Sequence, residues 1–248
     1  MGSTGSSSGS NLMNKEYQDM GNLTQSEIME WLRNNTNIAE WSTDRLTTGE
    51  LNAIQDYTGS AYAKINDNQY TVPWEEMDEY YKDKIAKIHN GLSKSEVNKP
   101  LVVHRACDFQ ILGDEYKYRD VYGDNAITAD EIKEGLRKMN NGVIQNDGFM
   151  SFSTDRNGHG LEGHGLIIDL HIPESTGAGA YVNHISYHDE EHEFLVNNNA
   201  VLKFDINSVK PVDPKYPQKG YTVDAYWLGQ AQAQTISPTN TGKRIKRR

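Results

Sequence analysis

Cysteine, net positive charge and long apolar runs are scarce or absent in this chain of 248 residues. Cys107 is the single cysteine, which excludes a framework of internal disulfides, and its apolar neighbours predict a buried, unreactive thiol. No stretch approaches the roughly 18 apolar residues that a membrane span needs. The formal net charge of -10 argues against general affinity for nucleic-acid phosphates. We therefore expect neither a membrane nor a nucleic-acid partner.

The two ends differ in composition from the rest of the chain. The first ten residues, MGSTGSSSGS, are rich in Gly and Ser, and they show no basic start followed by an apolar secretory stretch. Five of the last six residues, KRIKRR, are basic and follow a polar stretch. We expect a flexible leader or linker over 1–20, a single domain over 21–230, and a solvated polar and basic tail over 231–248.

Helical signals dominate the part from about 21 to 98. Capping boxes of the form S/T-x-x-E occur at Thr24 and Glu27, at Thr47 and Glu50, and further on at Thr128 and Glu131. The spacing of apolar residues predicts an amphipathic helix over 50–66 that is broken near Gly59. Another helix is expected over about 74–90.

From about 99 to 230 the chain is predicted to be rich in strands. Its short segments contain many β-branched and aromatic residues and are separated by Gly, Asn, Asp or Pro; they are LVVHRA, GFMSFST, GLIIDLHI, GAYV, EFLV, VLKFDI and YTVDAYWL. Because the helices come first and the strands later, the pattern favours an α+β fold over alternating βαβ units.

Two motifs in the second half admit more than one interpretation. GHGLEGHG contains G-x-G-x-x-G, but it leads into a strand instead of a helix, so a loop is favoured over a dinucleotide-binding turn. HDEEH matches a zinc-peptidase pattern, and His184, His188 and His192 repeat every four residues. A zinc-dependent hydrolase stays open as an alternative, although the flanking residues favour loop and strand over the helix that such a site requires.

Polar side chains on three expected strands form the stronger functional signal. Successive strand residues face opposite sides, so Ser151 and Ser153 point the same way, and so do Glu191 and Glu193. Arg105 lies in the apolar strand LVVHRA, where a lone cation needs an anionic partner. A guanidinium, two hydroxyls and two carboxylates suit an anionic ligand with an adjacent electron-poor centre.

This order of Arg, S-x-S and E-x-E resembles the arginine-serine-glutamate class of mono-ADP-ribosyltransferases. The likeness is to the enzymatic components of clostridial-type binary toxins and to related bacterial exoenzymes, and it covers about residues 46–227. In YTGSAYAKIN, Tyr57, Tyr62 and Asn66 have the spacing that these enzymes show in the helix over the bound dinucleotide, and Gln110 also agrees. Ala106 departs from the pattern, which usually has Gly or Arg there.

The resemblance implies a role for each of these residues. Those implied to bind NAD are Tyr57, Tyr62, Asn66, Arg105, Ala106, Gln110, Ser151 and Ser153. Those implied to be catalytic are Arg105, Ser151, Glu191 and Glu193. Glu193 would stabilise the cationic ribose, oriented by Ser151, while Glu191 would take a proton from the acceptor. Tyr187 is a candidate for contacting the target protein, with simple packing as the alternative.

The fold that the resemblance implies has N-terminal helices followed by two packed, mostly antiparallel sheets that form an NAD cleft. The implied reaction transfers ADP-ribose from NAD to an arginine of a target protein and releases nicotinamide. It uses NAD as co-substrate and needs no metal. We expect a monomer that is secreted or delivered into a target cell and acts in its cytoplasm. A non-catalytic NAD-binding module stays open as a further alternative.

Overall fold

The computed structural model of the protein describes residues 16–20, 23–35, 45–156, 165–188, 191–216 and 219–231. Most of the expected leader, the glycine-rich stretch 157–164 that the sequence predicts to be a loop, and the expected tail beyond 231 lie outside these ranges. Within them, no helix combines the length and the apolar character needed to cross a membrane.

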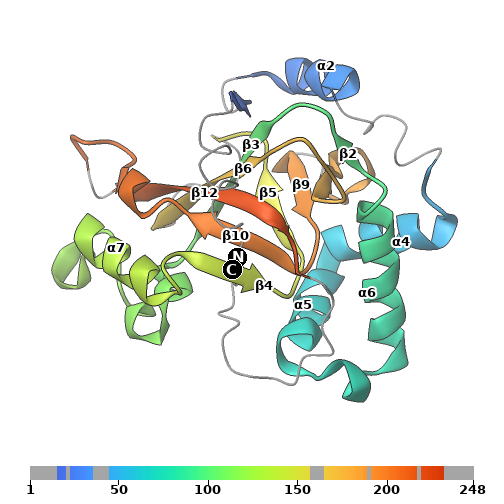
Figure 1. Ribbon diagram of the computed structural model, residues 1–248, viewed down its shortest axis with the longest axis horizontal. Coiled ribbons are helices and arrows are strands. Elements are labelled where there is room, and N and C mark those ends of the chain that lie inside the picture. Colours follow the sequence, from blue (N-terminus) through green and yellow to red (C-terminus); the bar gives the residue numbers. More distant parts are fainter. Residues whose placement is uncertain are drawn as a thin grey trace, which may run out of the picture.

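Helices gather in the first half of the chain, as the sequence predicts. They are α2 (Gln25–Asn35), α4 (Thr48–Asp56), α5 (Tyr62–Thr71), α6 (Glu79–Leu92) and, later, α7 (Ala129–Lys138). All three predicted capping boxes form, because in each the Thr side chain accepts from the Glu main chain and the Glu carboxylate accepts in return. Figure 1 shows α4, α5 and α6 together at one end of the molecule and α7 at the other.

The predicted break near Gly59 is confirmed. A π-helical turn over Tyr57–Ala61 joins α4 to α5, and Gly59 within it has non-helical dihedral angles (φ -89, ψ -125). The helix expected over 74–90 begins later than predicted. Trp74–Glu76 forms only a 3-10 turn, and α6 starts after Asp78, whose carboxylate accepts from the Tyr80 amide at 2.8 Å.

All seven predicted strand segments are strands. The full set is β1 (Gln18–Asp19), β2 (Glu96–Val97), β3 (Leu101–Cys107), β4 (Val143–Asn146), β5 (Met150–Ser153), β6 (Leu166–Ile172), β7 (Ser175–Thr176), β8 (Gly179–Tyr181), β9 (Glu193–Val196), β10 (Ala200–Phe204), β11 (Lys210–Pro211) and β12 (Tyr221–Gln230). The sequence did not predict β4 or the two-residue strands β1, β2, β7 and β11. The α+β fold class is therefore confirmed.

The main sheet is a single hydrogen-bonded path. Its order is β4-β10-β12-β6-β3-β5-β9-β8, with β1 beside β3 and β11 beside β12, while β2 and β7 form a separate pair. The path is mostly antiparallel, with parallel pairing of β12 to β6 and of β1 to β3. The expected two sheets are thus joined, but only one residue pair, His104 and Ser153, links β3 to β5. The two halves of the sheet diverge from this joint.

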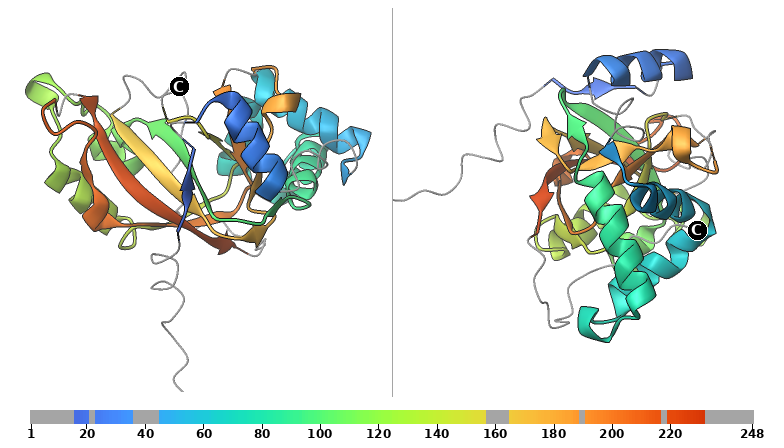
Figure 2. Two further views of the ribbon diagram at one scale, coloured as in Figure 1. Left: turned by 90° about the horizontal axis from the view of Figure 1, so that it is seen from above. Right: turned by 90° about the vertical axis from the view of Figure 1, so that its right-hand side faces the viewer.

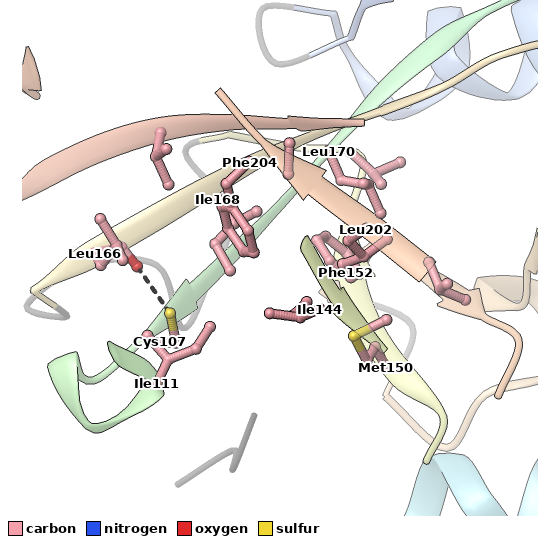
Figure 3. Packing of buried hydrophobic residues seen from close by; sticks show 14 of the residues in the cluster. Cys107, Ile111, Ile144, Met150, Phe152, Leu166, Ile168, Leu170, Leu202 and Phe204 are labelled. Carbon is pink, nitrogen blue, oxygen red and sulfur yellow. Dashed lines mark hydrogen bonds between the residues drawn. The ribbon is translucent and has the colours of Figure 1, made fainter. Parts of the chain in front are cut away.

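Buried side chains cover both faces of β5 and β9. Met150, Phe152 and Phe194 belong to a cluster packed within the sheet and against α2 and α7, part of which Figure 3 shows. Phe149 and Leu195 belong to a second cluster, which the helices α4, α5 and α6 complete. Alternation along the strands therefore turns odd-numbered residues of β5 and β9 toward these three helices. The two views of Figure 2 show the helices stacked against this end of the sheet.

Cys107 lies inside the first cluster, as predicted. Its thiol donates to the carbonyl of Leu166 at 3.5 Å, a contact drawn in Figure 3, and burial raises the pKa of the thiol to about 12. A thiol with so high a pKa forms little thiolate near neutral pH and is unreactive.

A polar network fastens α5 to the start of β5. The Asn66 amide donates to the Tyr57 hydroxyl at 2.9 Å and to the Phe149 carbonyl at 3.1 Å, and its carbonyl accepts from the Phe149 amide at 3.2 Å. The Tyr57 hydroxyl donates to the same Phe149 carbonyl at 3.2 Å. An alanine at Gly148 would place its Cβ 3.0 Å from the Asn66 side chain, so the approach is close.

A second polar network lies at β3. His104 is fully buried, and its Nδ1 lies 2.8 Å from Asp169 of β6 while its Nε2 lies 3.2 Å from Asp19 of β1. Asp169 also accepts from Thr222 at 2.7 Å and from Arg156 at 3.0 Å. An imidazole can donate from both nitrogens only when protonated, so a charged His104 ties β1 to the sheet.

We expect the stability of the protein to depend on pH through His104. Burial by itself lowers the pKa of His104, but the hydrogen bonds that its ring donates to Asp169 and Asp19 outweigh this effect, and the net pKa is raised. The resulting stability is complete below the unfolded pKa of about 6.5 and is lost as pH rises through the folded value. In urea titrations, Asp19→Asn should flatten the fall in unfolding free energy above about pH 6.5. Glu96→Gln, a carboxylate paired with Arg45, should leave it unchanged. Equal slopes for wild type and Asp19→Asn would contradict this role.

Removing the Asn66 side chain should destabilise the protein markedly. Asn66→Ala deletes the three hydrogen bonds that join α5 to Tyr57 and Phe149, leaving polar groups of the interior without them. We expect a loss of about 2 kcal/mol or more in urea unfolding. Asn68→Ala is the matched control, because Asn68 is also on α5 and its side chain donates to the Lys64 carbonyl of its own helix. Equal losses in the two variants would refute this docking role.

Candidate active site

Glu193 is the first residue of β9 and is almost completely buried. It lies directly opposite Ser153 on β5, and Ser151, which pairs with Leu195, lies two pairs further along. The Ser151 hydroxyl donates to the Glu193 carboxylate across the two strands. As predicted, Ser151 and Ser153 share a face, and the structure turns it toward the helical layer while Phe152 packs behind. The strand pairing therefore fixes the direction of the carboxylate.

Arg105 approaches the same pair from β3. Its side chain is buried, its guanidinium donates to the Ser151 carbonyl at 2.6 Å, and it lies 6.0 Å from the centre of the Phe152 ring. Since β3 and β5 part after a single residue pair, the guanidinium lies where the two halves of the sheet separate. One serine thus contacts the cation through its carbonyl and the anion through its hydroxyl.

Tyr57 brings the helical layer to this group. Burial raises the pKa of the Tyr57 phenol far above its ordinary value; the nearby carboxylate of Glu193 adds to the rise and the guanidinium of Arg105 opposes it. The phenol is therefore within electrostatic reach of both charged side chains. Tyr62 packs edge-on against Tyr57, with 6.4 Å between ring centres, and Asn66 completes the cluster through its bond to the Tyr57 hydroxyl. The structure brings together six of the predicted residues.

Glu191 lies outside the strand from which its direction was predicted. Strand β9 begins only at Glu193, and His192 between the two acids has a left-handed backbone (φ 50). Period-two alternation therefore does not extend to Glu191. The main chain here is held by β5 instead, because Ser153 donates to the Glu191 carbonyl at 2.9 Å and the Thr154 amide donates to the His192 carbonyl at 3.0 Å.

The remaining predicted residues make other contacts. Gln110 lies on the 3-10 turn Phe109–Leu112, where its amide donates to Asp114 at 3.3 Å. Ala106 follows Arg105 and pairs with Ile167 of β6, and Tyr187 is 62% exposed at the edge of the helical layer. The hydroxyl of Ser153 donates to the carbonyl of Glu191, as described above.

Sequence patterns missed residues that hold the main chain of Glu193 in place. Asn183 accepts from the Glu193 amide at 3.4 Å, and the Val182 amide donates to the Glu193 carbonyl at 2.9 Å. Neither Asn183 nor Val182 stands in a motif, so only the pairing of β8 with β9 could have identified them.

The histidines do not form the helical face that a zinc site requires. His184 lies in the 3-10 turn Asn183–Ile185, and His192 is left-handed. In the part of the chain that the structure describes, no group of three or more His, Cys, Asp or Glu side chains is placed to hold a metal ion. The segment 188–192 is described except for positions 189 and 190.

The observed geometry can perform two tasks. A buried guanidinium binds phosphate through its forked donors. A carboxylate fixed by a hydroxyl and by strand pairing stabilises positive charge that develops on a nearby sugar carbon.

Comparison with known proteins relates the whole arrangement to a described family. Residues 29–228 match the sequence model of the ADP-ribosyltransferase exoenzyme family. The curated NAD(+)--arginine ADP-ribosyltransferase EFV of Enterococcus faecalis is 26% identical over 163 residues, which are 64% of this chain and 29% of that protein. The chain therefore corresponds to less than a third of this relative's length.

Solved structures share the fold. Plx2a, an ADP-ribosyltransferase toxin from Paenibacillus larvae, superposes with a TM-score of 0.69 and 22% identity, covering 82% of this chain and 96% of that one. C3stau2 from S. aureus, solved with NAD, superposes with a TM-score of 0.66 and 15% identity, covering 87% of this chain and 100% of that one. At these identities the likeness shows the fold alone. The match over 29–228, with the fold to support it, shows that the chain belongs to the ADP-ribosyltransferase exoenzyme family.

Proposed function

We propose that this protein transfers ADP-ribose from NAD to an arginine side chain of a target protein and releases nicotinamide. The observation that carries the proposal is the buried group in which Ser151 contacts both the Glu193 carboxylate and the Arg105 guanidinium. The name of the relative EFV supports arginine as the acceptor, and the C3stau2 structure with NAD supports the co-substrate.

Binding of NAD is assigned to the side chains around the joint of the sheet. Arg105 holds a phosphate, and Tyr57, Tyr62 and Asn66 line the dinucleotide from the helical layer. In this scheme Ser151 keeps Glu193 aimed at the nicotinamide ribose, since their hydrogen bond leaves the carboxylate little rotational freedom. We retain Ala106, Gln110 and Ser153 as further NAD contacts.

The reaction breaks one bond and forms another. The bond from the ribose C1′ to nicotinamide breaks, nicotinamide leaves with the electron pair, and positive charge develops on the ribose. Glu193 stabilises that charge, through the ribose 2′-hydroxyl. A guanidinium nitrogen of the acceptor then bonds to C1′ and gives up a proton to Glu191, because a charged guanidinium is a poor nucleophile.

The proposal extends to the context of the reaction. The catalytic unit is residues 21–230, and the reaction needs one copy of the chain, NAD and an acceptor protein, without a metal, a nucleic acid or a membrane. We propose that the protein is secreted or delivered into a target cell and acts in its cytoplasm. The description of Plx2a as a toxin and the exoenzyme family support that assignment.

Replacing Glu193 should remove the first half of the reaction. Glu193→Gln keeps the size of the side chain and its contact with Ser151 but removes the negative charge. We expect nicotinamide release from NAD, measured without an acceptor, to fall by a factor of about 100 or more. Glu174→Gln, a carboxylate outside the cluster, serves as the control. Equally slow release by wild type and Glu193→Gln would contradict a catalytic role.

Replacing Glu191 should separate the two halves of the reaction. Glu191→Gln should retain slow NAD hydrolysis, because the ribose cation still forms, yet lose transfer to the guanidine agmatine by about 100-fold or more. The two rates can be followed in one assay as free nicotinamide and modified agmatine. A parallel loss of hydrolysis and transfer would refute this division of labour.

A further inference from the structure

Tyr187 lies against the π-helical turn that separates α4 from α5. Its main-chain amide donates to the Thr58 hydroxyl at 3.3 Å. A Cβ built on Gly59 would stand 3.0 Å from Cδ2 and 3.4 Å from Cε2 of the Tyr187 ring, so the ring rests directly on the glycine. Thr58 and Gly59 therefore contact the main chain and the ring of one tyrosine.

The turn itself is fixed from inside. Tyr57 is buried and bonded to the Phe149 carbonyl, next to the proposed catalytic group. Thr58 is 5% exposed, and its hydroxyl donates to the Gln55 carbonyl at 2.9 Å, which leaves its oxygen lone pairs for the Tyr187 amide. Consecutive residues of one turn thus face the proposed NAD site and the loop before Glu191.

The exposure of Tyr187 points to a recognition role. Its side chain is 62% exposed although its backbone amide is bonded to Thr58 and its ring rests on Gly59. An aromatic side chain on a fixed support offers a large contact area for little loss of conformational entropy, which makes it an effective anchor for a protein partner.

We propose that Thr58 and Gly59 are positioning residues that hold Tyr187 as the anchor for the acceptor protein. The inference rests on the proposed transferase function. In this arrangement the break in the helix at Gly59 makes room for the ring, and the Thr58 hydroxyl fixes the backbone beneath it. Thr58 and Gly59, called the Tyr187 seat below, affect the modification of protein acceptors. They do not affect the modification of small guanidines, because these do not reach Tyr187.

Hydrogen exchange tests the Tyr187 seat without relying on activity. Thr58→Val keeps the shape of the side chain but cannot accept from the Tyr187 amide, so this amide should exchange about tenfold faster. Thr58→Ser should restore protection. Thr71→Val is the matched control, because Thr71 donates to the Asp67 carbonyl of α5 but is not bonded to Tyr187. An unchanged exchange rate of the Tyr187 amide in Thr58→Val would overturn the proposal that Thr58 holds Tyr187.

The recognition role is tested by comparing two acceptors. Tagged NAD would label the proteins of an animal-cell lysate in one reaction and agmatine in another. For Thr58→Val and Gly59→Ala, we expect the ratio of protein labelling to agmatine labelling to fall about tenfold. Thr58→Ser and Thr71→Val should keep the wild-type ratio. The double variant Thr58→Val with Tyr187→Ala should have the same labelling ratio as Tyr187→Ala alone, because both substitutions act on one interaction.

The outcomes separate the two proposals. Additive losses in the double variant, an unchanged ratio in Thr58→Val, or agmatine labelling by wild type without any protein labelling would overturn the recognition role. A wild-type protein that releases no nicotinamide and labels neither acceptor would instead remove the proposed function. Hydrogen exchange would then still report whether Thr58 holds Tyr187.

Discussion

The hydrogen bond from Ser151 to Glu193 is the interaction on which the rest of the site depends. It crosses β5 and β9, whose residues pair from Met150 to Ser153 in a continuous register. Hydrophobic side chains on the opposite face of both strands hold that register, since a slip by one residue would exchange the buried and polar faces. The direction of the carboxylate is thus set by the packing of Phe152 and Phe194 behind it.

Two further elements converge on this pair because of how the sheet and helices are joined. The sheet parts after the pairing of His104 with Ser153, which lets Arg105 reach the Ser151 carbonyl. From the other side, the bonds of Asn66 and Tyr57 to Phe149 fasten the helical layer two residues before Ser151. The same turn that buries Tyr57 supports Tyr187, so the proposed sites for NAD and for the acceptor share one structural support.

Sequence predicted the features that local chemistry determines. The capping boxes, the break at Gly59 and the alternation of Ser151 with Phe152 follow from side-chain hydrogen bonding, backbone freedom and the strand period. Strand β4 was missed because VIQN offers only two apolar residues to a pattern search. The alternation expected for Glu191 fails because His192 adopts a left-handed backbone, which no composition rule indicates. Thr58 was missed because its partner Tyr187 is distant in the chain, and Asn183 was missed because it stands in no motif.

A crystal structure of the Glu193→Gln variant with NAD tests the central claim most directly, because slow turnover would preserve the intact dinucleotide. The account predicts a phosphate of NAD on the Arg105 guanidinium, the nicotinamide ribose beside residue 193, and Tyr57 and Asn66 along the dinucleotide. NAD bound away from Arg105, or a nicotinamide ribose turned away from residue 193, would contradict it.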